Sequence, residues 1–273
     1  MSAIIVVLKC LTNMHVGNGE VNYNIIDNEV EHDPVTGYPT INSSGVKGAL
    51  REFLTSSLNE NEIAEIFGGR VSKETTGHAT QQGNAPQQGK LKFLPANMLA
   101  IPFRASSGRK PYYKITTPSS LKRFNDAIDL FDIAPDKKMV KESYTNIPPG
   151  IEGYTLPNQE PVDGKYSLER LGAHFTGMYA YPIEDEVFRS LALPVLARNC
   201  LEDGRSCNLW YEEVVPHKSV FYFPVVTEDV NNKWLARLTA TLEGKVVQFG
   251  GNASIGYGLC KVSILQGASI QTK

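Results

Sequence analysis

Acidic residues alternate with apolar ones between positions 25 and 33, and they are the first candidates for chemistry. The acids are Asp27, Glu29, Glu31 and Asp33 on one face of the pattern, and Ile26 and Val30 fall on the other face. This period of two predicts a strand with one polar face. Such a face can be an ordinary solvated edge, or it can hold Mg²⁺ through one or two carboxylates. Asp27 is the strongest candidate, because an ionised aspartate orients a metal or a ribose hydroxyl more readily than it accepts a proton.

Two other segments carry groups suited to proton transfer or stacking. His15 lies in a loop just after the first predicted strand, where most histidines bond a neighbouring carbonyl; it becomes a candidate if the loop reaches Asp27. Tyr211 and Glu213 lie on the return arm of a predicted hairpin, where a tyrosine and one glutamate can face RNA or form ordinary cross-strand pairs. Trp210, just before them, is expected in the core.

A basic helix start is the best candidate for phosphate contact. Ser43 or Ser44 is expected to cap a helix in which Lys47 and Arg51 share a polar face. Free backbone N–H groups and the positive end of the helix dipole favour a phosphate there. Gly45 and Gly48 flank Lys47 and lower helix propensity by roughly 1 kcal/mol each, which favours a functional reason for them.

A second candidate contact is the glycine-rich stretch from Gly250 to Gly258. Its glycines at 250, 251, 256 and 258 would let the backbone approach an RNA strand closely, although a plain turn has the same pattern. The basic stretch 101–124, with Tyr112 and Tyr113, is equally a solvated face or a groove for a strand.

Composition sets the broad class. The chain has 273 residues, 41% of them hydrophobic, and a net charge of -2, so any nucleic-acid binding must come from local basic patches. There is no apolar run long enough to span a membrane and no signal sequence, so we expect a cytoplasmic protein. The four cysteines show no metal-ligand spacing and are expected to be reduced and mostly buried.

The order of predicted elements indicates an α+β fold. We expect strands at 2–12, 90–94, 112–117, 220–226, 245–249 and 259–265, and helices at 43–54, 59–67, 118–131, 184–192 and 232–242. Segments 196–201 and 208–213 around Asp203-Gly204 predict a hairpin. The chain is interpreted as one domain over 1–273, with a mobile loop at 70–89 and a long insertion at 141–165. Its order is compatible with a modified ferredoxin-like, RRM-like core.

Taken in order, these motifs resemble the RAMP superfamily of CRISPR effector proteins. The residues that carry the resemblance are 15–20, Asp27, the 33–39 turn and the 43–51 helix. The resemblance is more specific to the repeated backbone subunit of the type III-B (Cmr) complex. Four further stretches carry this part of it: 94–108, 116–124, 209–216 and 249–258. The resemblance covers nearly the whole chain.

The resemblance implies a ferredoxin-like palm with a hairpin thumb, copies of which polymerise along a CRISPR RNA beside other type III subunits. It implies cleavage of paired target RNA at regular intervals by an acidic residue. From the carboxylates themselves we expect this cleavage to depend on a divalent metal, Mg²⁺ or Mn²⁺. Asp27 matches the catalytic acid and metal position, His15 and the 211–213 stretch match residues near the cleavage site, and Lys47 matches a guide contact.

The sequence departs from the family pattern at two places, and three other interpretations remain open. Asn13 stands where the family often has proline, and the run 42–46 differs from the commoner sequence at the helix entry. The rival interpretations are a type III-A backbone subunit, a guide-binding subunit without nuclease activity, and a guide-processing endoribonuclease in which His15 matters and metal does not.

Overall fold

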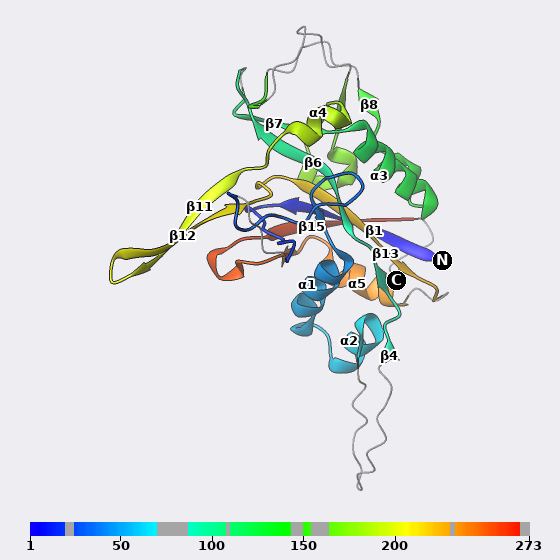
Figure 1. Ribbon diagram of the computed structural model, residues 1–273. Coiled ribbons are helices and arrows are strands. Elements are labelled where there is room, and N and C mark those ends of the chain that lie inside the picture. Colours follow the sequence, from blue (N-terminus) through cyan, green and yellow to red (C-terminus); the bar gives the residue numbers. More distant parts are fainter. Residues whose placement is uncertain are drawn as a thin grey trace.

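The computed structural model describes residues 1–19, 25–69, 87–107, 110–142, 150–153, 164–229 and 233–267. Its main feature is a large, mostly antiparallel sheet in a mixed α+β fold (Figure 1). Across this sheet the strands run β14 (Val246–Gln248), β15 (Leu259–Gln266), β1 (Ser2–Cys10), β13 (Val220–Thr227), β6 (Ala96–Arg104), β7 (Tyr112–Thr116), β10 (Tyr179–Pro182), β9 (Lys165–Ser167) and β8 (Lys141–Glu142). Only the β7–β10 pair along this path is parallel.

Short strands complete the sheet. β2 (Thr40–Ile41) pairs with β6, and β5 (Lys92–Phe93) pairs with β13. β3 (Gly68–Gly69) and β4 (Gln87–Gln88) form a separate pair.

The central strand β1 is buried on both faces, which sets the layers of the molecule. Ile4, Val6 and Leu8 join a core with apolar residues of α1 (Ser43–Thr55), α2 (Glu60–Phe67) and α5 (Lys233–Leu242). Ile5 and Val7 join a second core with α3 (Pro118–Leu130). Because alternate β1 side chains point to opposite faces, helices cover both sides of the sheet.

Helix ends follow the signals in the sequence. Asn59 accepts a hydrogen bond from the Glu62 backbone in a capping box, and Gly68 ends α2 at φ 81°. Thr117 caps α3, with Pro118 at its first position. The predicted helix at 184–192 is α4 (Asp185–Ser190). α1 packs through Val46, Leu50 and Leu54, as its apolar spacing predicts.

The predicted hairpin is confirmed as β11 (Val195–Glu202) and β12 (Arg205–Glu213), which project from the body of the molecule (Figure 1). Asp203 and Gly204 take φ of 49° and 78°, the left-handed pair that a tight two-residue turn needs. The Asp33-to-Gly37 turn is also confirmed, with Gly37 at φ 72° and its N–H bonded to the Asp33 carbonyl.

Several expectations are wrong. Residues 25–33 form only isolated bridges at Asn28, Val30 and His32. Strand β6 was not predicted, because a strand buried on both faces has no alternation. Gln87 and Gln88, placed in a loop, pair with β3. The rest of that loop, 70–86, and most of the 141–165 insertion, 143–149 and 154–163, lie outside the described residues.

Corrections at single residues concern caps and burial. Asn42, not Ser43 or Ser44, occupies the N-cap of α1, and its side chain makes no capping bond. Trp210 is half-buried on the hairpin and not in the core. All four cysteines are free, but only Cys10 and Cys260 are buried, since Cys200 and Cys207 lie on the exposed hairpin. Among the described helices, none has the length and apolar character of a membrane span.

Candidate active site

Asp27 lies against the base of the hairpin. Its backbone N–H donates to the Tyr211 carbonyl at 3.0 Å, and its Oδ2 accepts the Tyr211 N–H at 2.7 Å. The residue is exposed, and within the described part of the chain its second carboxylate oxygen accepts no hydrogen bond. One oxygen therefore fixes the side chain, while the other faces solvent and is available to a substrate or a cation.

His15 reaches the same strand edge two residues further along. Its Nδ1 lies 2.8 Å from the Glu213 carbonyl, so Nδ1 carries the proton in this arrangement. Nε2 lies 4.0 Å from Glu212 Oε1, and the residue is only 9% exposed. The carbonyl bond expected of such a histidine is present, and the loop does reach the strand that holds Asp27.

The two glutamates of the stretch have different surroundings. Glu213 Oε2 accepts the Val30 N–H at 3.1 Å, which ties the Asp27 segment to the hairpin. Glu212 is 3% exposed, and its carboxylate receives Arg198 Nη1 at 2.8 Å and Asn252 Nδ2 at 2.7 Å. Glu212 thus joins the hairpin to the glycine-rich loop.

Sequence reasoning missed Arg198 and Asn252 and chose Glu213 over Glu212. The signal for Arg198 was present, because the Asp203-Gly204 turn fixes a register in which Arg198 lies diagonally across from Glu212. The Arg198 guanidinium also lies 5.7 Å from the Trp210 ring centre and 5.4 Å from that of Tyr257. These contacts fix the angle between the hairpin and the loop.

The glycine-rich loop packs against the His15 loop. The Gly251 N–H donates to the His15 carbonyl at 2.8 Å. A Cβ on Gly250, which has φ 81°, would lie 2.3 Å from that carbonyl oxygen, and one on Gly258 would lie 1.8 Å from Phe249 O. Gly250 and Gly258 are therefore needed by the loop itself. Gly251 and Gly256 have open space where a Cβ would lie and remain the candidates for close approach by a strand, although Gly256 also takes a left-handed φ of 82°.

The α1 residues make no described contact with this cluster. Ser44 and Arg51 are exposed, Lys47 is half-buried, and no acid lies in the first turn of the helix. Among the described residues Lys47 has no carboxylate partner. The uncapped helix start and a free lysine keep the predicted phosphate contact chemically reasonable.

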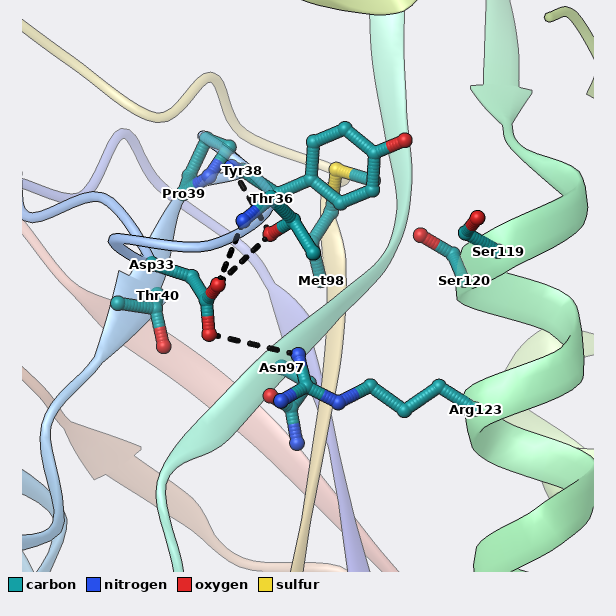
Figure 2. A pocket seen from close by; sticks show the side chains of 10 residues that line it. All are labelled: Asp33, Thr36, Tyr38, Pro39, Thr40, Asn97, Met98, Ser119, Ser120 and Arg123. Carbon is teal, nitrogen blue, oxygen red and sulfur yellow. Dashed lines mark hydrogen bonds and ion pairs between the residues drawn. The ribbon is translucent and has the colours of Figure 1, made fainter. Parts of the chain in front are cut away.

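The four acids do not share one face. Asp33 closes its own turn by accepting the Thr36 N–H at 2.8 Å and hydroxyl at 3.0 Å, and it pairs with Arg123 at 3.5 Å (Figure 2). Burial alone would raise the pKa of Asp33, but the hydrogen bonds from Thr36 and Val35 and the charge of Arg123 lower it. The described residues contain no group of three or more possible metal ligands. Asp27 is left as a single-carboxylate candidate.

The pocket beside Asp33 is too small for a ligand. Thr36, Tyr38, Ser120 and Arg123 line a space of about 20 Å³, enough for one water (Figure 2). Burial and then the hydrogen bond to Asp185 raise the pKa of Tyr38 to about 12. We assign this pocket a structural role.

Most of the basic stretch 101–124 is already paired or buried. Arg104, Lys122 and Arg123 pair with Glu152, Asp126 and Asp33 at 3.8, 2.6 and 3.5 Å. Lys114 and Tyr113 are buried. These pairs neutralise most of the exposed positive charge along the described part of this stretch.

Comparisons with known proteins agree on the family and fold. The model of the RAMP superfamily matches residues 7–177. The CRISPR system Cmr endoribonuclease Cmr4 of Pyrococcus furiosus is 26% identical over 97% of this chain and 96% of its own length.

Solved structures give the same result for the fold. A chain of the type III-B Cmr-beta complex in its apo state has a TM-score of 0.70, 20% identity and coverage of 98% of this chain and 99% of its own. Oligomeric Cmr4 from Pyrococcus furiosus has a TM-score of 0.64, 20% identity and coverage of 97% and 98%. Because the family model matches more than half of it, this chain belongs to the RAMP superfamily.

Proposed function

We propose that this protein is a repeated backbone subunit of a type III-B CRISPR effector complex, which binds CRISPR RNA and cleaves complementary target RNA. The observation that carries the proposal is Asp27, an exposed carboxylate held by the Tyr211 N–H at 2.7 Å at the base of a projecting hairpin. The full-length similarity to a protein named as a Cmr endoribonuclease supports it. A Cmr-beta structure bound to cognate target RNA, with a TM-score of 0.69, has the same fold. Partners are then guide RNA, target RNA, further copies and other effector subunits, in the prokaryotic cytoplasm.

We also infer that the centre of the sheet is a ferredoxin-like palm with the hairpin as thumb. β1 and β6, connected through α1, are separated by β13. β13 and β15, connected through α5, are separated by β1. Two such split βαβ units are the pattern of a βαββαβ core.

The chemistry assigned to this site is attack of the ribose 2′-hydroxyl on the adjacent phosphate, which leaves a cyclic phosphate and a 5′-hydroxyl. Asp27 orients the attacking hydroxyl through its free oxygen. His15 and Glu213 bond backbone groups of the hairpin and of the Asp27 segment, so they hold the acid in place. Together these contacts fix the acid before RNA binds, which favours the reacting geometry.

A divalent cation such as Mg²⁺ or Mn²⁺ fits this site only in part. Asp27 supplies one carboxylate, and Mg²⁺ commonly uses one or two carboxylates together with substrate phosphates. Such a cation would be held by Asp27 and the RNA, and it would supply stabilisation of the charge that develops on the phosphate.

The test is cleavage of guide-complementary RNA by the assembled complex in excess Mg²⁺. We expect Asp27→Ala to lower the rate by about 10²- to 10³-fold or more while assembly and target binding persist. Glu186→Ala, which removes an exposed acid of α4, serves as the matched control and should cleave normally. Chelation of the metal should stop wild-type cleavage. Unchanged cleavage by Asp27→Ala with the target fully bound would reject the assignment.

A further inference from the structure

Two exposed cysteines lie on adjacent strands of the projecting hairpin, outside the site described above (Figure 1). Cys200 belongs to β11 and Cys207 to β12. Free cysteine is among the most buried residue types in proteins, and Cys10 and Cys260 of this chain follow that rule. The hairpin pair departs from it, and we call this pair the hairpin dithiol.

The register of the hairpin brings the two cysteines together. Leu201 pairs with Ser206, whereas Cys200 pairs with Asn208, so the register shifts by one residue between these pairs. The shift is a β-bulge in which Cys207 is the extra residue and lies, together with Asn208, opposite Cys200. Residues opposed on antiparallel strands have Cα atoms about 4.5 to 5.5 Å apart, and a disulfide spans about 4.4 to 6.8 Å. The backbone therefore suits a bond between the two sulfurs.

The hydrogen bonds of the two thiols show which one a reagent meets first. The Cys207 thiol donates to the Cys200 carbonyl oxygen at 3.1 Å, so its sulfur already lies against the Cys200 backbone. The Cys200 thiol makes no hydrogen bond within the described part of the chain and is exposed. A reagent from solvent can therefore reach Cys200 while Cys207 stays beside it.

The other cysteine pair is shielded. Cys10 and Cys260 are paired across β1 and β15 with their sulfurs 3.7 Å apart, but they are only 1% and 0% exposed. The hydrogen bond to Cys10, and then burial, raise the pKa of Cys260, which disfavours the reactive thiolate. This buried pair is therefore an internal control for the exposed one.

We propose that the hairpin dithiol is a redox modification site, at which a small disulfide such as oxidised glutathione converts Cys200 and Cys207 into a disulfide bond. The Cys200 thiolate attacks one glutathione sulfur, the glutathione disulfide bond breaks, and one glutathione leaves. The Cys207 thiolate then attacks the cysteine sulfur of the mixed disulfide and releases the second glutathione. Two protein thiols are oxidised, one glutathione disulfide is reduced to two thiols, and the two cysteine protons pass to the leaving glutathiones.

The new bond fixes the bulge, which sets the direction of the hairpin tip at 201–206. A bulge bends and twists its strand, and a covalent link across it removes the freedom to straighten. Exposed disulfides are the readily reduced and regulatory ones, and those that form in a cytoplasm are usually transient. Asp27 bonds the hairpin at Tyr211, so the proposal does not rest on target cleavage.

The test incubates the full chain in buffers of graded ratios of reduced to oxidised glutathione. The remaining thiols are then alkylated, and the chain is digested with trypsin and analysed by mass spectrometry without reduction. Trypsin cuts after Arg198, Arg205 and Lys218, so the two cysteines fall on separate peptides that only a disulfide can join. We expect the joined peptides to exceed mixed glutathione adducts at least about tenfold, because the second thiol is held beside the first at a high effective concentration. Excess reduced glutathione should separate the peptides again.

Cys200→Ser and Cys207→Ser are matched variants, because each removes one sulfur from an exposed position. Each should melt as wild type does and should form only a mixed glutathione adduct at its remaining hairpin cysteine. Three results in wild type would overturn the proposal: mixed adducts without joined peptides, joined peptides that contain Cys10 and Cys260 in place of the hairpin pair, or disulfide-linked dimers of the chain. Target cleavage is scored separately, so none of these results bears on Asp27.

Discussion

At the scale of single residues, the buried ammonium of Lys114 makes folding depend on pH. The pKa of Lys114 falls from 10.5 to about 8 on folding, so between these values the unfolded chain binds more protons than the folded one. Stability therefore rises with pH across this window. Relative to Lys114→Met, the free energy of unfolding of wild type should gain up to about 3 kcal/mol between pH 8 and pH 10.5.

Denaturant unfolding of both proteins across this pH range measures the difference. Lys9, Cys10 and Lys218 interact electrostatically with Lys114, and comparison with Lys114→Met removes most of their shared contribution to the pH dependence. A constant difference between the two proteins from pH 7 to pH 10.5 would contradict the burial of a charged Lys114.

Removal of the buried acid Glu212 should lower the stability of the protein. Its carboxylate is bonded to Arg198 and Asn252, and Glu212→Ala leaves both without their partner. We expect the free energy of unfolding to fall by about 2 to 4 kcal/mol. Glu202→Ala, on the exposed part of the same hairpin, should change it by about 0.5 kcal/mol or less. Equal melting curves for the two variants would show that the Glu212 contacts do not hold the hairpin.

Neighbouring glycines of the 250–258 loop should behave differently. Gly250→Ala places a Cβ 2.3 Å from the His15 carbonyl oxygen at φ 81°, so stability should fall by about 2 kcal/mol or more. Gly251→Ala meets nothing closer than 3.9 Å and should fold normally. Thermal unfolding of the two variants tests this. Similar losses would mean that the loop does not pack against His15 as described.

At the scale of elements, α1 offers a prediction about RNA binding. Lys47→Ala should weaken binding of single-stranded RNA by about tenfold and reduce the slope of affinity against salt by about one, while the melting curve stays unchanged. The effect should be equal on unrelated sequences, because phosphate contacts carry no base information. Filter binding across a salt series measures it, with Lys122→Ala as the control. If Lys47→Ala loses no more affinity than the Lys122→Ala control, Lys47 is an ordinary surface lysine and not a phosphate contact.

The elements that could be predicted are those with strong local signals. The capping box at Asn59, the Pro118 start and the Asp203-Gly204 turn each fix an element through neighbours in the chain. Strand β6 lacks a period because both its faces are buried. Residues 25–33 have the period of a strand but bond to β12 and to residues 16–17 and 38–40 through scattered bridges. For β6 and for residues 25–33, tertiary contacts and not the local sequence determine the structure.

At the scale of the whole molecule, the candidate site is assembled from distant parts of the chain. The site brings together His15, Asp27, Glu213 and Gly251 through bonds between segments separated by up to about 240 residues along the chain. Residue types made each a candidate, but only the resemblance to a family indicated that they belong together. Asn252 had no comparable signal, because its approach to Glu212 appears only in the fold.

The measurement that tests the central claim most directly is target cleavage by a complex carrying Asp27→Asn. Asparagine keeps an oxygen that can accept the Tyr211 N–H now bonded at 2.7 Å, so the hairpin base should stay in place while the charge is lost. With target occupancy confirmed in excess Mg²⁺, we predict normal assembly and a rate lowered about 10²-fold or more, matching Asp27→Ala. Cleavage at the wild-type rate would show that the Asp27 carboxylate does not carry the reaction.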